Sequence, residues 1–123
     1  MAKILLVDDE PRIVTFLAKG LRRQNYESEF AFDGRQALNL ALSRAFDLMV
    51  LDLGLPVMDG FDVISSLRAS KLSLPVIIIT AHSEVDCTRA VELGADDFLH
   101  KPFRFSELLP KLQRLLEDEI ESA

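Results

Sequence analysis

Five polar residues end or follow short strand-like runs in this sequence and could do chemistry together: Asp8, Asp9, Asp52, Thr80 and Lys101. Carboxylates that lie close together raise one another's pKa values, and a divalent cation removes that repulsion. Mg²⁺ prefers oxygen ligands and typically binds one or two carboxylates plus the phosphate of a substrate. An aspartate beside such a cation can attack phosphorus and form an aspartyl phosphate. A lysine ammonium and a threonine hydroxyl would then offset the charge on the transferred group.

Each of these residues also has an ordinary structural explanation when it is taken alone. Asp8 or Asp9 would favour the start of a helix, because a carboxylate stabilises the positive end of the helix dipole. Asp52 would be a loop residue, Thr80 a strand end and Lys101 a solvated surface charge. The chemical interpretation is favoured because these residues fall at the ends of four different strand-like runs.

The elements that would position these side chains alternate between strand-like and helix-like patterns. Apolar runs at residues 3–7, 48–51 and 75–80, an alternating stretch at 27–32 and a short stretch at 97–100 predict five strands. Apolar residues three and four apart predict the first three helices, and residues 85–93 and 105 to about 118 predict two more. The apolar positions of the first three helices are Ile13, Phe16, Leu17 and Leu21, then Ala37, Leu38, Ala41 and Leu42, then Phe61, Ile64 and Leu67.

Strands that alternate with helices predict a parallel sheet, because right-handed crossovers place helices on both of its faces. The expected fold is a three-layer (βα)5 α/β sandwich, a flavodoxin-like doubly wound sheet, in one domain over residues 1–123. In the common strand order 2-1-3-4-5 the first and third strands are neighbours. Asp8, Asp9 and Asp52 would then meet at the carboxyl edge of the sheet, where open parallel sheets bind ligands.

The composition and charge of the chain indicate which binding partners are disfavoured and where in the cell we expect the protein. The formal net charge of −6 argues against direct binding of nucleic acid or of an anionic membrane surface. The longest apolar run, residues 76–79, is far too short to span a bilayer, and the N-terminus lacks the features of a signal peptide. Cys87 is the only cysteine, so no internal disulfide can form. We therefore expect a cytoplasmic protein.

Four motifs carry a resemblance to a known family. They are ILLVDDE at residues 4–10, LDLGLPVMDG at 51–60, ITA at 79–81 and GADDFLHKPF at 94–103. Together they make the chain similar, over essentially its whole length, to the receiver domains of bacterial response regulators, including chemotaxis-type regulators. The resemblance implies a signalling switch of a two-component phosphorelay. Asp52 would accept a phosphoryl group from a histidine kinase or a histidine phosphotransfer protein.

The resemblance also implies a metal site. Mg²⁺ would be bound directly by Asp9, Asp52 and the backbone carbonyl of Gly54, while Asp8 would act through a metal-bound water. The chain would catalyse only its own phosphorylation and dephosphorylation, and would otherwise be no enzyme.

Further residues would contact or sense the phosphoryl group. By the same resemblance Thr80 and Lys101 contact it, and the Lys101–Pro102 peptide bond is cis. Phosphorylation would draw Thr80 inward and let Phe98 turn, which changes the surface of the fourth helix, fifth strand and fifth helix. Phe98 as a plain core residue is the alternative. Either way, the phosphoryl group must favour one of two existing states.

Two positions tune the lifetime of the aspartyl phosphate in this family, and here they are Gly54 and His82. Gly54 offers no side chain to orient an attacking water. His82 is able to hydrogen-bond a water molecule. An exposed loop histidine without such a role is the alternative, so the lifetime stays open.

Parts of the last motif resemble the class whose receivers form dimers and control winged-helix DNA-binding domains. Charged residues of the fourth helix and fifth strand would contribute to such a dimer: Arg89, Glu92 and Asp97. The last helix departs from this class, because Ser106 and Gln113 stand where basic residues are usual. Pro110 is a second departure, because proline inside a helix lacks a backbone N–H and destabilises the helix. The loss of stability is smaller if Ser106 is the N-cap, since Pro110 then lies just inside the first turn. A phosphorylation-dependent homodimer is therefore possible rather than implied.

Other functions remain as alternatives. The chain could be the receiver part of a larger DNA-binding regulator or hybrid kinase, since no output domain is expected within its residues. A phosphohydrolase of the aspartate-nucleophile type would carry a second acidic residue at position 54, where this chain has glycine. A flavodoxin-like cofactor binder is disfavoured, because Asp8, Asp9 and Glu10 would repel phosphate. A non-phosphorylated interaction module is the last alternative.

Overall fold

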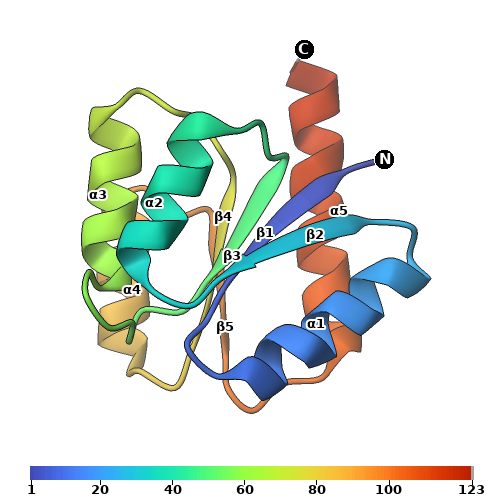
Figure 1. The fold of residues 1–123 in the computed structure, drawn as a ribbon, viewed down its shortest axis with the longest axis horizontal. Coiled ribbons are helices and arrows are strands. Elements are labelled where there is room, and N and C mark those ends of the chain that lie inside the picture. Colours follow the sequence, from blue (N-terminus) through green and yellow to red (C-terminus); the bar gives the residue numbers. More distant parts are fainter. Residues whose placement is uncertain (123) are drawn as a thin grey trace.

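The computed structural model describes the backbone of residues 1–122 and the side chains of residues 1–117. All strand pairs are parallel and the order is β2-β1-β3-β4-β5, which confirms the predicted topology (Figure 1). The strands are β1 (Lys3–Val7), β2 (Glu27–Ala31), β3 (Leu48–Leu51), β4 (Val76–Thr80) and β5 (Asp97–His100). The helices are α1 (Pro11–Arg23), α2 (Gly34–Ser43), α3 (Gly60–Ala69), α4 (Glu84–Leu93) and α5 (Phe105–Ser122).

Alternate residues of the central strands enter two separate cores, one on each face of the sheet. Leu6, Val50 and Ile77 belong to the core under α1 and α5. Leu5 and Met49 belong to the core under α2, α3 and α4, on the opposite side of the sheet in Figure 1. Because both faces are covered, these strands are apolar throughout, which is the pattern that identified them in the sequence.

Side-chain caps fix where three helices begin. Asp33, Asp59 and Ser83 each accept a hydrogen bond from the backbone N–H three residues later, at the starts of α2, α3 and α4. Caps of this kind stabilise a helix by about 1 kcal/mol. In a parallel sheet such helix starts follow the carboxyl ends of the strands, so they surround the edge where the polar residues of interest lie.

Two apolar helix positions proved to be exposed. Phe16 is 43% exposed and Leu42 is 51% exposed, so the apolar spacing that located these helices includes positions outside the core. The buried stripe of α1 is instead Val14, Leu17 and Leu21, which leaves Phe16 at its margin. There its ring packs edge-on against Phe103, at a centroid distance of 6.3 Å.

Helix α5 begins at the predicted residue and continues to Ser122, beyond the predicted end near residue 118. The helix begins at Phe105, and the Glu107 carboxylate accepts a hydrogen bond from the backbone N–H of Arg104, so Ser106 is not the N-cap. Pro110 therefore lies inside the helix and offers no N–H to the carbonyl of Ser106.

Within the described residues, no helix is both long and apolar enough to cross a membrane.

Candidate functional site

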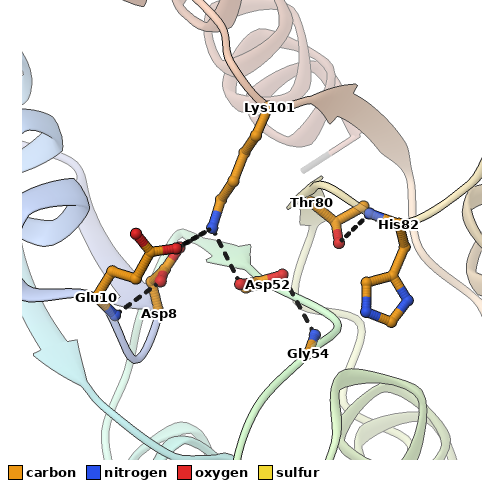
Figure 2. Close-up of polar contacts among 7 residues, drawn as sticks. All are labelled: Asp8, Glu10, Asp52, Gly54, Thr80, His82 and Lys101. Atoms are coloured by element: carbon orange, nitrogen blue, oxygen red, sulfur yellow. Dashed lines mark hydrogen bonds and ion pairs between the residues drawn. The ribbon is translucent and has the colours of Figure 1, made fainter.

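The predicted polar residues lie at the carboxyl edge of the sheet (Figure 2). Asp8 follows β1 and is 1% exposed, and Asp52 follows β3 and is 6% exposed. Thr80 ends β4 and is fully buried, while Lys101 follows β5. Because β1, β3, β4 and β5 are consecutive in the sheet, residues that are far apart in the sequence meet here.

Lys101 joins the two buried carboxylates. Its Nζ atom lies 2.8 Å from Asp8 Oδ2 and 3.0 Å from Asp52 Oδ2, and 3.4 Å from Glu10 Oε1. The peptide bond between Lys101 and Pro102 is cis. One ammonium group therefore partly neutralises three carboxylates, and Asp52 has a cation beside one of its carboxylate oxygens.

The pKa values at this edge reflect that arrangement. Burial raises the pKa of Asp8 above its ordinary value, although Lys101 and the backbone N–H of Glu10 oppose the change. Burial alone would lower the pKa of Lys101, but hydrogen bonds and charge interactions with Asp8 and Asp52 raise it above its ordinary value. Lys101 is therefore protonated throughout the physiological range, whereas ionised Asp8 is disfavoured by folding.

Asp8→Asn is expected to stabilise the metal-free protein at neutral pH, by about 1 kcal/mol. The raised pKa means that folded Asp8 holds its proton more tightly than unfolded Asp8. Its stabilising contribution is complete at acid pH and is lost as pH rises through the folded-state pKa. The gain from Asn should therefore vanish at acid pH. Urea unfolding of both proteins in a chelator, across pH, measures this. Asp9→Asn is the exposed control, and a less stable Asp8→Asn at neutral pH would contradict the assignment.

Three carboxylates at the end of β1 form a set of oxygen donors. Oxygen atoms of Asp8, Asp9 and Glu10 all lie within 4.8 Å of one another. Asp8 Oδ1 accepts the backbone N–H of Glu10 at 2.9 Å, whereas the buried Oδ2 has only the Lys101 ammonium beside it. Such a set of oxygens fits a hard divalent cation such as Mg²⁺.

Asp52 lies outside this three-carboxylate group. Its Oδ1 accepts the backbone N–H of Gly54 at 3.3 Å, and its Oδ2 faces Lys101. Glu10 was not among the predicted site residues. The signal that could have identified it is its place directly after the Asp8-Asp9 pair, at the end of the first strand.

The predicted switch residues lie on neighbouring strands. Thr80 Oγ1 accepts the backbone N–H of His82 at 3.1 Å, which leaves its hydroxyl proton available for another acceptor. Phe98 is half-buried and pairs in register with Ile78, whereas Thr80 pairs with His100. The Phe98 ring meets the His100 ring edge-on at 5.6 Å. Phe98 therefore contacts His100 on β5 rather than the polar residues around Asp52.

His82 and Gly54 lie against one another. A Cβ atom added to Gly54 would be 3.1 Å from His82 Nε2, so the glycine leaves room for the ring. The other ring nitrogen, Nδ1, is 3.1 Å from Asp86 Oδ2. Asp86 was not predicted from the sequence, because a carboxylate four residues after a histidine at a helix start does not by itself indicate a functional site.

An apolar groove opens beside Lys101. It has a volume of about 520 Å³ and is lined by Glu10, Ile13, Phe16, Ala81, Lys101, Pro102 and Phe103. The exposed ring of Phe16 also meets Phe105 edge-on, at 6.4 Å. This groove was missed in the sequence, because α1 and the segment after β5 contribute to it from opposite ends of the chain.

Comparisons with known proteins agree on one family. Residues 4–113 match the family described as the response regulator receiver domain. The transcriptional regulatory protein PcoR of Escherichia coli is 41% identical over 94% of this chain and 52% of its own length. The response regulator ArlR of Staphylococcus saprophyticus is 38% identical over 94% of this chain and 53% of its own length. The chain thus spans about half the length of these curated relatives.

Solved structures show the same likeness. The receiver domain of the Francisella response regulator 1452 superposes with a TM-score of 0.92 at 31% identity, over 97% of this chain and 99% of that one. The beryllofluoride-activated receiver domain of DrrB, a Thermotoga maritima protein, superposes with a TM-score of 0.86 at 31% identity. The match covers 95% of this chain and 98% of that one. The chain therefore belongs to the response regulator receiver domain family.

Proposed function

We propose that this chain is the phosphoacceptor switch of a two-component phosphorelay and that Asp52 accepts the phosphoryl group. The observation that carries the proposal is the position of Lys101 Nζ, 3.0 Å from the Asp52 carboxylate in a nearly buried pocket. That carboxylate is positioned as a nucleophile with a cation fixed beside it. A structural ion pair alone would not need Asp8, Asp9 and Glu10 gathered next to it.

The chain's own residues supply most of the chemistry of transfer. An Asp52 oxygen bonds to phosphorus while the bond from phosphorus to the donor's leaving group breaks. Lys101 balances charge on the phosphoryl oxygens, and the Thr80 hydroxyl donates a hydrogen bond to one of them. Asp8, Asp9, Asp52 and the Gly54 carbonyl would hold Mg²⁺. Bound Mg²⁺ would supply further charge neutralisation.

The proposed output is a change in the surface formed by α4, β5 and α5. Thr80 moves toward the phosphoryl group, and Phe98 turns inward from its half-buried position. Addition of Mg²⁺ and beryllofluoride, a phosphoryl mimic, should shift amide NMR signals both around Asp52 and near Phe98. Asp52→Asn should show neither set of shifts. Shifts confined to the pocket would mean that this chain accepts phosphate without transmitting a change to that surface.

The proposed donor is a histidine kinase or a histidine phosphotransfer protein. The groove beside Lys101 is apolar and adjoins the acceptor, so a donor protein that binds there brings its phosphohistidine to Asp52.

The proposed output target is a protein domain in the cytoplasm, because the net charge of −6 disfavours binding of this chain to nucleic acid.

Phe16→Ser should separate docking from chemistry. We expect transfer from a phosphorylated donor protein that uses the wild-type chain to slow about tenfold, the size expected for loss of a buried aromatic anchor. Uptake from acetyl phosphate, which needs no docking, should be unchanged. Phe30→Ser removes another exposed ring, on β2, and is the matched control. Equal slowing with both donors would argue against a docking role for the groove.

A phosphorylation-dependent homodimer is a further proposal for the same output surface. Asp97 on β5 lies 3.1 Å from Lys111 and 2.9 Å from Arg114, both on α5. The last helix thus carries basic residues at this face, although not at the positions considered in the sequence. Light scattering with and without beryllofluoride measures the oligomeric state. A molar mass that stays unchanged when beryllofluoride is added would exclude this dimer.

A further inference from the structure

Helix α4 has little apolar anchorage to the body of the protein. Its buried residues are Cys87 and Ala90, both small, whereas each of the other helices buries at least one leucine within the described residues. Val85, on its first turn, is 78% exposed. Burial of a small side chain stabilises less than burial of a leucine, because the gain scales with the apolar area removed from water. Contacts of another kind therefore contribute strongly to the position of α4.

One such contact joins α4 to α3, its neighbour in the layer of helices on that side of the sheet (Figure 1). The Arg89 guanidinium lies over the Phe61 ring, with Cζ 4.2 Å from the ring centroid. A cation at this distance is attracted by the negative face of the ring. Among the described side chains no carboxylate forms an ion pair with Arg89, although Glu92 lies one turn later on the same helix. The Phe61 ring is thus the contact that orients this guanidinium.

The ring beneath Arg89 belongs to the end of the acceptor loop. Phe61 is 8% exposed and follows Gly60, whose backbone N–H donates to the Leu53 carbonyl at 2.9 Å. A Cβ added to Gly60 would lie 2.7 Å from the backbone oxygen of Asp52, so the start of α3 packs directly on the acceptor residue. The Arg89–Phe61 contact therefore links the acceptor loop to the outer side of α4 by a route that does not pass through β4 or β5.

A second arginine holds the other end of α4. Arg68 on α3 donates two hydrogen bonds to the Gly94 carbonyl, from Nε at 3.1 Å and from Nη2 at 2.8 Å. Its Nη1 donates to the Leu72 carbonyl at 2.7 Å, and Nη2 lies 3.4 Å from Asp96 Oδ2. Gly94 has φ 125°, and a Cβ there would lie 2.8 Å from Arg68 Cγ, so this close approach requires glycine. Several directed bonds therefore fix the C-terminal end of α4.

The two contacts differ in strength. Hydrogen bonds from a charged donor are roughly twice as strong as neutral ones, and Arg68 makes three of them to carbonyl oxygens. An exposed cation–π contact, in comparison, biases an equilibrium only about two- to fivefold. Residues 89 and 94 are about 7.5 Å apart along the helix axis, at 1.5 Å per residue. When α4 tilts, the Arg89 contact should therefore open while the Arg68 bonds persist.

The proposed movement of Thr80 acts on the end of α4 that is held less firmly. The backbone N–H of His82 donates to Thr80 Oγ1 at 3.1 Å, and Ser83 caps the helix directly afterwards. An inward shift of Thr80 would displace this first turn and move Arg89 relative to Phe61. Ordinary surface packing is the alternative. A contact of that kind would be equally strong in both states and would shift no equilibrium.

We propose that the stacking of Arg89 on Phe61 is a latch that restrains α4 in the unphosphorylated chain. The Arg68–Gly94 contact is the pivot about which α4 turns when the latch opens. This inference rests on the proposed function, because it requires that phosphorylation of Asp52 moves the α4 surface. The latch lowers the population of the state that the phosphoryl group favours. Its removal should therefore raise the affinity for a phosphoryl mimic.

The test is the Mg²⁺-dependent affinity for beryllofluoride, titrated into dilute protein and followed by amide NMR. We expect Arg89→Met to bind beryllofluoride about two- to fivefold more tightly than the wild type, the size of an exposed cation–π contact. Loss of a positive charge by itself would weaken binding of this anionic mimic, so the two explanations predict opposite signs. Arg35→Met removes an exposed guanidinium from the first turn of α2 and is the matched control for charge. That control should not tighten binding.

Further variants separate the latch from other roles of the same residues. Phe61→Leu should tighten binding by a similar factor, and Arg89→Met should have no additional effect in that background. Arg89→Lys keeps a cation over the ring and should lie closer to the wild type. Arg68→Met should lower the midpoint of thermal unfolding but change the affinity less than about twofold, because the pivot is present in both states. Thermal unfolding also shows that each variant is folded.

Three results would overturn the inference while leaving the proposed function intact. Unchanged or weaker beryllofluoride binding by Arg89→Met would remove the latch. A further effect of Arg89→Met in the Phe61→Leu background would mean that the arginine acts through another partner. Tightening by Arg68→Met as large as that by Arg89→Met would remove the pivot. Failure of the wild-type chain both to take up a phosphoryl group and to bind beryllofluoride would overturn the proposed function, and this inference with it.

Discussion

Lys101→Met is expected to lower the free energy of unfolding of the metal-free protein at neutral pH by about 3 kcal/mol. Removing one member of a buried ion pair leaves the other charge uncompensated, and here two carboxylates lose the same partner. The Asp8 side chain is 1% exposed and that of Asp52 is 9% exposed, so water cannot replace the ammonium. Urea unfolding in a chelator measures the loss.

The pH dependence of that loss has a definite sign. Because folding raises the pKa of Lys101, the ammonium stays charged throughout the acid and neutral range, and its contribution is lost on the alkaline side only at high pH. The carboxylates, however, take up protons as the pH falls. The deficit of Lys101→Met should therefore shrink toward acid pH, and Mg²⁺ should reduce it at neutral pH by replacing the missing charge.

The same substitution should slow phosphoryl uptake from acetyl phosphate by about 10²-fold, the usual cost of one charge-stabilising group. Lys111→Met is the matched control, because its partner Asp97 keeps a second cation in Arg114. We expect that control to change stability by less than about 1 kcal/mol. A Lys101→Met protein with wild-type stability and uptake would show that the Lys101 contacts with Asp8 and Asp52 are incidental.

Gly34→Ala should have the second large effect, a loss of about 2–4 kcal/mol in the free energy of unfolding. Gly34 begins α2, and a Cβ there would lie 1.8 Å from the backbone oxygen of Met58. The loop that carries Met58 connects Asp52 to α3, and it already contains Val57 at φ 71°, a strained conformation for a β-branched residue. The loop has little freedom to move away, so either α2 or the loop must shift.

Gly20→Ala is the comparison for Gly34→Ala, because the added Cβ meets a side chain instead of the backbone. Its Cβ would lie 2.5 Å from the Phe105 ring, which is a side chain and is able to rotate away. Alanine also gains about 1 kcal/mol over glycine inside a helix, so the net change should be small. Thermal unfolding of both variants separates a backbone clash from a side-chain clash. Equal stability of the two would contradict the close packing of α2 on the acceptor loop.

Features that depend on short-range pattern were predictable from the sequence. The strands could be located because a sheet covered on both faces requires continuous apolar runs, as in Leu48–Leu51. Polar residues at the ends of those runs, such as Asp8 and Asp52, could then be placed together by strand order alone. The edge position of Lys101 follows from the same reasoning.

Features that depend on contacts between distant segments were not predictable. Phe16 satisfied the spacing of a buried helix face, but its ring meets Phe103 and Phe105 from the other end of the chain. The contact of His82 with Gly54 likewise needed three-dimensional positions.

The most direct test of the central claim is intact mass after incubation with acetyl phosphate, with and without Mg²⁺. We predict a gain of one phosphoryl group that requires Mg²⁺ and is absent in Asp52→Asn. A rapidly hydrolysed adduct would still be revealed by Mg²⁺-dependent binding of beryllofluoride to the wild-type chain. Uptake that persists in Asp52→Asn would place the phosphoryl group elsewhere. Absence of both uptake and beryllofluoride binding would contradict the phosphoacceptor function and favour an interaction module that is not phosphorylated.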